Sequence, residues 1–278
     1  MKTISKVYMT LIFLILYIPI IVLILFSFNN TGNTGSFTGF SLYWYKELFA
    51  SPDTFNALKN TLILALSASV IATILGTAAS VGIGKFKSKA IRNGVLSVTN
   101  VPMMNPDIVT GISMMLLFVL VGGLLQADEK LGFWTILIAH ITFCLPYVIL
   151  SVRPRVLGLN RSLSEAAMDL GCTPVSAFFK VELPAIMPGI ISGFIMAFTL
   201  SLDDFVISYF TTGNDFQTLP LLIYSMTKKE VTPDIYALSS LMIGAVLILL
   251  ILSNIAEAKG RGKAAETPAE MAERKGFI

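Results

Sequence analysis

The stretch SLSEAAMDLG, at residues 162–171, decides the fold. Ser162 and Glu165 form a capping-box pattern, which predicts that a helix starts there. Gly171 suits the left-handed residue that ends a helix. Four small or apolar residues between them fall on one helical face, at i, i+3, i+4 and i+7: Leu163, Ala166, Ala167 and Leu170. The pattern predicts one short helix that ends in a sharp turn.

A second short helix is expected directly after that turn. Thr173 suits an N-cap and Pro174 suits the first helical position, and we expect Pro184 to end this piece. The segments on either side, residues 132–152 and 188–212, are apolar and long enough to cross a bilayer. The pair of short helices therefore lies in a loop, residues 153–187, that projects from a membrane.

The rest of the chain contains more apolar stretches of this kind, and a membrane helix needs about 20 mostly apolar residues. We interpret six of them as spans, at residues 7–28, 60–84, 95–125, 132–152, 188–212 and 235–256. Composition agrees, because 13% of the residues are charged, whereas a soluble domain carries roughly a quarter. Pro102 and Pro106 should break or kink the third span. We predict an all-α integral membrane protein with a transmembrane domain at 1–256 and a charged tail at 257–278.

The basic residues indicate the orientation. With the N-terminus in the cytoplasm, fifteen of the 20 Lys and Arg residues fall on the inner side of the membrane. Cytoplasmic loops carry an excess of Lys and Arg, so we expect both termini and the 153–187 loop on the cytoplasmic side.

The second span carries a small residue at every fourth position: Ala68, Ala72, Gly76, Ser80 and Gly84. Such a stripe lets two helix backbones approach closely in lipid. It is compatible with packing inside this chain or against a partner subunit, and the sequence does not separate the two.

The 153–187 loop resembles the EAA loop of ABC-importer permeases, whose pattern is EAA-x3-G-x9-I-x-L-P. The matching residues are Glu165, Ala166, Ala167, Gly171, Leu183 and Pro184, with Val181 in place of the Ile. The resemblance implies the type I permease fold and a coupling helix that docks on an ATPase subunit. The chain has no G-x4-G-K-[ST] run. We therefore expect it to bind no cofactor, and ATP and Mg²⁺ to be used by the partner ATPase.

Two adjacent carboxylates, Asp203 and Asp204, lie within the fifth span. A charge at mid-span costs roughly 2.5–3.5 kcal/mol on insertion scales. Neighbours on a helix point about 100° apart, so at least one of them should line the pathway or an interhelical cleft. A cationic substrate could neutralise it. The alternative is a pair near the outer surface that is hydrated or bonded to another span.

Other candidate pathway residues are weaker. Asp107 should lie in the first turn of a helix inside the third span, where the helix dipole alone would favour a carboxylate. Ser201 is within about one turn of the Asp pair and could add an acceptor. Trp44 lies in an aromatic stretch, 42–49, that predicts an amphipathic interface helix; it could face a cation or serve as an anchor. For His140 we expect a structural hydrogen bond between spans.

A more specific resemblance is carried by five runs: residues 104–109, 132–134, 140–146, 201–204 and 219–226. They are similar to permeases of the spermidine/putrescine (PotC-type) family, over about residues 7–256. The resemblance implies import of linear polyamines across the bacterial cytoplasmic membrane by alternating access. It also implies a second homologous permease, two ATPase subunits and an extracytoplasmic binding protein as partners. The family's transport-critical positions would be Trp44, Asp107, Glu165, Ser201, Asp203 and Asp204.

Three other functions compete with polyamine import. An ABC permease for another small solute, such as an amino acid, would have the same fold, although two carboxylates would repel an anion. A proton-driven transporter would use Asp203, Asp204 and His140, but the sequence shows no inverted repeat. An intramembrane enzyme would need a nucleophile–base pair that the sequence does not suggest. Two cysteines and one histidine give no metal-site pattern, and we expect lipid but no nucleic acid as a partner.

Overall fold

The computed structural model describes residues 2–31, 36–86, 88–126, 131–213, 216–228 and 233–265. Among these, six helices are long and apolar enough to cross a membrane. They lie at Ser5–Phe26, Pro52–Lys85, Asp107–Leu124, Phe133–Leu157, Pro174–Asp203 and Pro233–Ile251. The predicted all-α, six-span membrane fold is confirmed.

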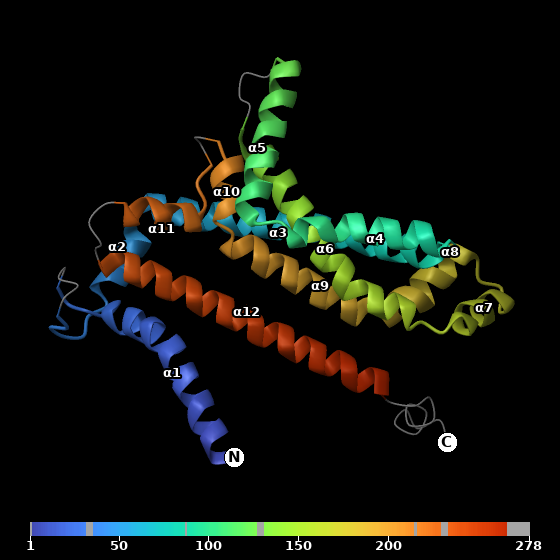
Figure 1. Ribbon diagram of the computed structural model, residues 1–278, viewed down its shortest axis with the longest axis horizontal. Helices are drawn as coiled ribbons and strands as arrows, with labels where there is room; N and C mark the ends of the chain where they lie inside the picture. The colour runs from blue at the N-terminus through green and yellow to red at the C-terminus, as the bar shows by residue number, and fades with distance from the viewer. Residues whose placement is uncertain are drawn as a thin grey trace. The chain divides into compact units, whose positions relative to one another are not determined.

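The chain divides into two compact units, Met1–Thr61 with Phe216–Leu247 and Leu62–Asp215 with Ile248–Ile278. The first unit contains α1 (Lys2–Phe26), α2 (Tyr43–Ala50), the start of α3 (Pro52–Lys85), α11 (Leu219–Thr227) and the first part of α12 (Pro233–Ala265), up to Leu247. Its core joins α2, α3, α11 and α12 through Leu48, Ala57, Leu219 and Leu238. Thr61 Oγ1 accepts a 2.7 Å hydrogen bond from Leu219 N, which attaches the start of α11 to α3 (Figure 1).

The predicted aromatic helix at 42–49 is observed as α2. Tyr45 OH lies 2.7 Å from both Ser27 Oγ and Ser240 Oγ. These contacts connect α2 to the end of α1 and to α12 within the first unit.

The second unit contains the rest of α3, α4 (Lys89–Met104), α5 (Asp107–Leu124) and α6 (Phe133–Leu157). It continues through α7 (Arg161–Asp169), α8 (Pro174–Ala177), the π-helical turn η1 (Phe178–Glu182), α9 (Leu183–Asp203) and α10 (Val206–Thr211). The α6–α9 pair packs most extensively. The hydrogen bonds that link it include Cys144 Sγ to Ala197 O at 3.4 Å and Ser151 Oγ to Gly189 O at 3.1 Å. The core around this pair consists of Ala72, Ala139, Phe143, Cys144, Val148, Val152, Ile186, Ala197 and Ile207.

The small-residue stripe of α3 packs inside this chain. Ala68, Ala72 and Ser80 are buried, and a Cβ on Gly76 would lie 2.6 Å from Val148 Cγ1 of α6. Of the two explanations that the sequence left open, close packing within the subunit is therefore confirmed.

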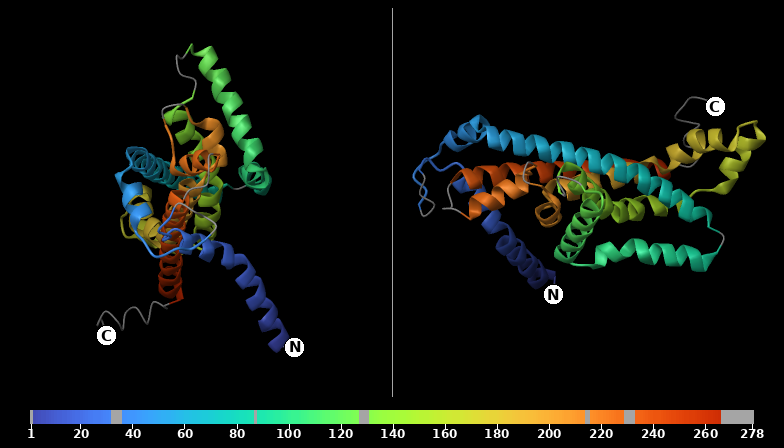
Figure 2. Two further views of the ribbon diagram at one scale, coloured as in Figure 1. Left: turned by 90° about the vertical axis from the view of Figure 1, so that its left-hand side faces the viewer. Right: turned by 90° about the horizontal axis from the view of Figure 1, so that it is seen from above.

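The expected break in the third span lies at Asn105–Pro106. Asn105 is extended, with φ −79° and ψ 143°, because a residue before proline avoids the helical region. Pro102, by contrast, lies inside α4. The membrane span therefore starts at Asp107 instead of residue 95. Figure 2 shows that α4 doubles back after α3 and that α5 leaves it at a steep angle.

The fifth span was wrongly predicted as one helix over 188–212. Upstream, α8, η1 and α9 run on without interruption, so the spanning helix begins at Pro174. Downstream, the helix stops at Asp203, and Asp204 is extended with φ −64° and ψ 125°. The Asp204 carboxylate accepts hydrogen bonds from Ile207 N and Ser208 N, and these bonds stabilise the break.

The other span predictions differ from the structure at their ends. Helix α1 covers Lys2–Phe26 and α3 begins at Pro52, both earlier than expected. Helix α6 continues to Leu157, and α12 runs into the predicted tail as far as Ala265. Residues 266–278 of that tail lie outside the described residues.

Candidate functional site

The first helix of the 153–187 loop, α7, is capped by Asn160. Its side chain accepts a 3.1 Å hydrogen bond from Ser162 N, and its backbone is extended. The predicted start at Ser162 is therefore wrong by two residues, and Glu165 makes no capping box. Asn is at least as good an N-cap as Ser, so the upstream residue takes that role and Glu165 lies within the helix.

The turn after α7 is the one that Gly171 predicts. Gly171 has φ +89°, Cys172 N donates to Ala167 O, and Gly171 N donates to Met168 O. This pair of bonds is the Schellman motif, whose left-handed residue favours glycine. Thr173 then caps α8, accepting a hydrogen bond from Ser176 N, with Pro174 at its start. Both sequence predictions for this turn are confirmed.

Pro184 does not end the second helix of the loop. Leu183 N donates to Phe178 O, five residues back, and the π-helical turn η1 leads directly into α9. A π-turn is one way to carry a helix past an irregularity, and such turns are frequent at functional sites. As a result, the loop and the fifth span share one continuous backbone.

The apolar face of α7 is not covered within the described chain. Leu170 is 88% exposed, and Leu163 and Met168 are also exposed. The predicted residues Glu165, Ala166, Gly171 and Pro184 are exposed as well, whereas Ala167 and Leu183 are half-buried. Exposed apolar side chains beside exposed small residues are typical of a surface that contacts another protein.

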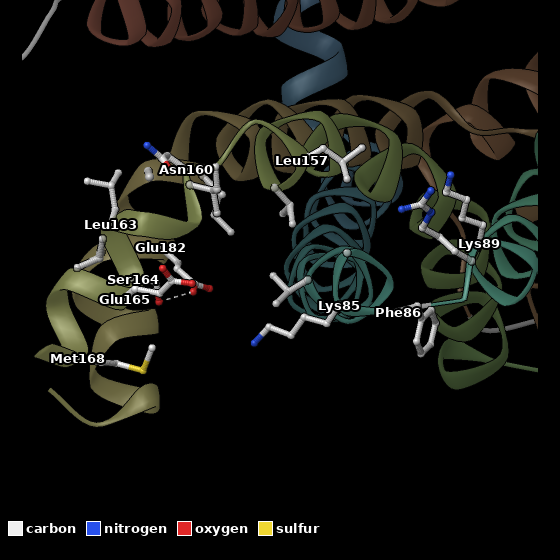
Figure 3. A pocket seen from close by; sticks show the side chains of 18 residues that line it. Lys85, Phe86, Lys89, Leu157, Asn160, Leu163, Ser164, Glu165, Met168 and Glu182 are labelled. Carbon is white, nitrogen blue, oxygen red and sulfur yellow. Dashed lines mark hydrogen bonds between the residues drawn. The ribbon is translucent and has the colours of Figure 1, made fainter.

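A cavity of about 680 Å³ lies between this loop and the ends of α3, α4 and α6 (Figure 3). Three basic side chains on α3 and α4 line it, those of Lys85, Lys89 and Arg92. Glu165 and Glu182 line the side formed by α7 and η1, where Ser164 Oγ donates a 2.9 Å hydrogen bond to Glu182 Oε1. The two sides of the cavity therefore carry opposite charge.

The second group of predicted residues lies where α9 ends. Asp204 follows α9 and caps α10: its two carboxylate oxygens accept hydrogen bonds from Ile207 N at 3.3 Å and Ser208 N at 2.8 Å. The first N–H groups of a helix have no partner inside that helix. A capping carboxylate supplies that partner, so Asp204 stabilises the break.

His140 of α6 completes this arrangement. Its Nδ1 lies 2.7 Å from Ser201 Oγ and its Nε2 lies 3.0 Å from Ser208 Oγ. Nε2 is also 3.5 Å from Asp204 Oδ2, with side chains only 1% and 7% exposed. We call His140, Ser201, Asp204 and Ser208 the break cluster. The predicted interhelical hydrogen bond of His140 is confirmed. For Asp204 the structure shows the alternative in which the carboxylate is bonded to another span.

The break cluster contains the residue types of a hydrolytic triad, which the sequence did not suggest. Ser201 is 2% exposed and Ser208 is fully buried. A nucleophile must reach its substrate within about 3–3.5 Å, which this burial prevents. The cluster is therefore a structural network.

The environment of Asp203 differs from that of Asp204, whose side chain is buried. It is the last residue of α9 and its side chain is exposed. Asp107 is exposed in the first turn of α5. One turn further along α5, a Cβ on Gly111 would lie 2.9 Å from Phe210 Cδ2 and 3.5 Å from Val206 O at the start of α10. Asp107 therefore lies one helical turn from the point where α5 contacts the start of α10.

Trp44 lies in the first unit, whereas the other candidates lie in the second. Its indole Nε1 donates a 2.8 Å hydrogen bond to Asn29 O, and its ring makes an edge contact with Tyr43. These contacts fix the ring orientation within α2.

Sequence reasoning missed two contributors, the cap Asn160 and the basic side of the cavity. Asn160 could have been found, because an Asn just before an apolar pattern, here three residues before Leu163, is itself an N-cap signal. The cavity could not, because Lys85, Lys89 and Arg92 precede the loop by about seventy positions and nothing in their local pattern links them to it.

Comparison with known proteins agrees with this architecture. The family described as "Binding-protein-dependent transport system inner membrane component" matches residues 72–258. The putrescine transport system permease protein PotI of Escherichia coli K12 is 42% identical over 237 residues, covering 85% of this chain and 84% of PotI. The spermidine/putrescine transport system permease protein PotC of Haemophilus influenzae is 40% identical over 250 residues, covering 89% of this chain and 94% of PotC.

Solved structures share the fold at low identity. A bacterial ABC transporter involved in the import of the acidic polysaccharide alginate has a chain that superposes with a TM-score of 0.71 and 16% identity, covering 94% of this chain and 95% of its own. A chain of the MetNI methionine ABC transporter superposes with a TM-score of 0.56 and 15% identity. The match covers 75% of this chain and 98% of the MetNI chain. The spans, the uninterrupted helix from the 153–187 loop into the membrane and these matches lead to one conclusion. The chain belongs to the family of binding-protein-dependent transport system inner membrane components.

Proposed function

We propose that this chain is a permease subunit of an ATP-driven importer that moves linear polyamines into the cell. The observation that carries the proposal is the exposed Asp203 at the interrupted end of a membrane helix, in a chain with 42% identity to a putrescine permease. Its cycle is alternating access: a binding protein delivers the substrate outside, and ATP binding and hydrolysis by partner subunits open and reset the path.

The end of α9 supports a cationic substrate. A helix C-terminus carries roughly half a negative charge on its unpaired carbonyls, and Asp203 adds a carboxylate at the same place. Asp107, which lies one helical turn from the contact between α5 and the start of α10, adds another. Ser201, by contrast, is buried in the break cluster, so its contribution to the path is indirect. We assign Asp203 and Asp107 as substrate contacts, Asp204 and Ser201 as supports of the break, and Trp44 as an aromatic contact for the cation.

The 153–187 loop supports coupling to an ATPase. Its exposed apolar face, with Leu170 at 88% exposed, needs a protein partner to become buried. In this proposal Glu165, Ala166, Ala167 and Gly171 dock on the ATPase. Leu183 and Pro184 join the docked loop to the fifth span. ATP and Mg²⁺ belong to that partner, of which the importer has two copies, beside a second homologous permease.

The orientation follows from charge. Fifteen of the 20 basic residues fall on the side of the 153–187 loop, and the positive-inside rule assigns that side to the cytoplasm. We therefore propose a multi-pass protein of the bacterial cytoplasmic membrane with both termini inside. A proton-driven mechanism is not needed, since the family is binding-protein-dependent and two of its three candidate proton carriers, His140 and Asp204, bond one another.

Uptake of labelled spermidine and putrescine tests the proposal. The chain is expressed with its partner permease, ATPase and binding protein in cells without polyamine importers, alongside Asp203→Asn and the charge-preserving Asp203→Glu. We expect ATP-dependent uptake that Asp203→Asn lowers by about tenfold, an effect of the size of one lost ionic contact, roughly 1.5 kcal/mol. Asp203→Glu should retain most of it.

The outcomes separate the parts of the proposal. Equal uptake by the wild type and Asp203→Asn would remove Asp203 from the path and leave the importer in place. An assembled importer that moves an amino acid but no polyamine would refute the polyamine assignment. Uptake that continues without ATP and stops with an uncoupler would refute the ABC mechanism.

A further inference from the structure

His140 holds both sides of the α9–α10 break. Nδ1 contacts Ser201, which precedes the break on α9, and Nε2 contacts Ser208, which follows it on α10. Because both contacts come from one rigid ring on α6, the two helix ends cannot shift apart without losing at least one of them. His140 thus links the two helix segments on either side of an interruption in a membrane span.

The protonation pattern of the ring follows from its neighbours. A carboxylate only accepts hydrogen bonds, so the ring atom facing Asp204, Nε2, carries a hydrogen. In a neutral ring Nδ1 is then the acceptor, and Ser201 Oγ donates to it across 2.7 Å. The Asp204 carboxylate also accepts hydrogen bonds from Ile207 N and Ser208 N. The His140 ring and the start of α10 therefore hold the carboxylate from two directions.

Fixing Asp204 also fixes its neighbour. Asp203 and Asp204 are consecutive, yet Asp204 has a side chain 7% exposed while Asp203 is exposed. With Asp204 held inward, the backbone at the break directs the Asp203 carboxylate outward. Without the His140 ring, the backbone at Asp203 and Asp204 could rotate, and either carboxylate could take the buried position.

We propose that His140 is a positioning residue for transport: it holds Asp204 and the α9–α10 break so that Asp203 alone faces the cationic substrate. This inference rests on the polyamine import proposed above and adds a residue that does not touch the substrate. Its effect should therefore be on selectivity between substrates of different charge, in addition to any effect on stability.

The test measures a ratio, which does not depend on how much importer is assembled. Membrane vesicles that contain the complete importer take up labelled spermidine and putrescine from one mixture. We expect His140→Leu to change the ratio of the two uptake rates at least about threefold, in the same direction as Asp203→Asn. The double variant should change it no further, since residues that act through one another are non-additive.

Conservative substitutions at His140 sharpen the test. The amide of Gln lies near the position of Nε2 and can still donate to Asp204, whereas the amide of Asn lies near Nδ1 and reaches only toward Ser201. His140→Gln should keep a ratio near that of the wild type, and His140→Asn should resemble His140→Leu. Ser151→Ala is the matched control, because it removes another α6–α9 hydrogen bond, to Gly189 O, away from the break. It should leave the ratio unchanged.

A second measurement does not require a polyamine. A nitroxide spin label is attached at Asp203→Cys in a Cys172→Ser background, where the remaining Cys144 is fully buried. We expect His140→Leu to increase the mobility of the label and Ser151→Ala not to. If the wild-type importer moved no polyamine, the proposed function would be refuted, and the mobility of the spin label would still test the positioning role. Unchanged mobility and an unchanged ratio in His140→Leu, with uptake falling only as assembly falls, would overturn the positioning role.

Discussion

The hydrogen bonds that cap the 153–187 loop join residues two to five positions apart, whereas His140 reaches Ser201 and Ser208 across 61 and 68 positions. The loop is exposed and shaped by its own sequence. The break cluster is buried and shaped by the packing of α6 on α9. A change in the loop should therefore alter function while the fold survives, and a change in the break cluster should first alter stability.

The largest effect on uptake is expected for Gly171→Val. A β-branched residue at φ +89° is a severe backbone outlier, and a left-handed conformation costs a residue with a side chain about 1–2 kcal/mol. The loop would turn elsewhere and misplace α7, so we expect uptake to fall about tenfold or more while thermal stability changes little.

Gly171→Asn is the control for this prediction, because Asn tolerates the left-handed region better than other non-glycine residues. Transport assays with matched amounts of purified complex make the comparison. A valine variant with full uptake would show that the turn geometry is not needed.

Asp204→Ala tests the other side of the comparison. It removes the cap of α10 and leaves His140 Nε2 facing no carboxylate, which should cost about 3 kcal/mol. Since the chain is large, this corresponds to a fall in Tm of roughly 6–12 °C. Thermal unfolding of the purified complex measures it.

Asp203→Ala, one position away and exposed, provides the matched control and should shift stability by less than about 0.5 kcal/mol. Equal shifts in Tm for the two variants would contradict the division into a structural and a pathway carboxylate.

Gly76→Ala should give a smaller loss. The added methyl would lie 2.6 Å from Val148 Cγ1, and overpacking of this kind costs about 1–3 kcal/mol. The same substitution at Gly82 of the same helix meets nothing within 4 Å and should be neutral. Unfolding in detergent compares the two, and Val148→Ala should rescue Gly76→Ala. If the second substitution failed to rescue the first, the α3–α6 contact would not be the cause.

The smallest effect is expected for Ser164→Ala. It removes the hydrogen bond to Glu182 Oε1, which is only partly buried and so contributes at most about 1 kcal/mol. Uptake should change less than about twofold in an initial-rate assay. A loss as large as that of Gly171→Val would instead assign the Ser164–Glu182 pair a part in coupling.

The two regions also differ in how far they could be predicted from sequence. Gly171, Thr173 and Pro174 each carry a local rule, and the structure follows those rules. The break at Pro106 was predictable for the same reason, because proline restricts the residue before it. The break at Asp204 was not, since Val206–Thr211 continues an apolar run and the hydrogen bonds that stabilise the interruption come from α6. Pairing between residues more than sixty positions apart leaves no periodic pattern.

The π-helical turn η1 has a mechanical consequence. Because it joins α8 to α9 without a gap, the 30 residues from Pro174 to Asp203 form one continuous helix, about 45 Å long when measured along its path. One end carries the exposed loop and the other carries the Asp203 carboxylate. The π-turn at η1 departs from the regular α-helical hydrogen bonding of that helix, so we expect its stiffness to set how much of a movement of the loop reaches the carboxylate.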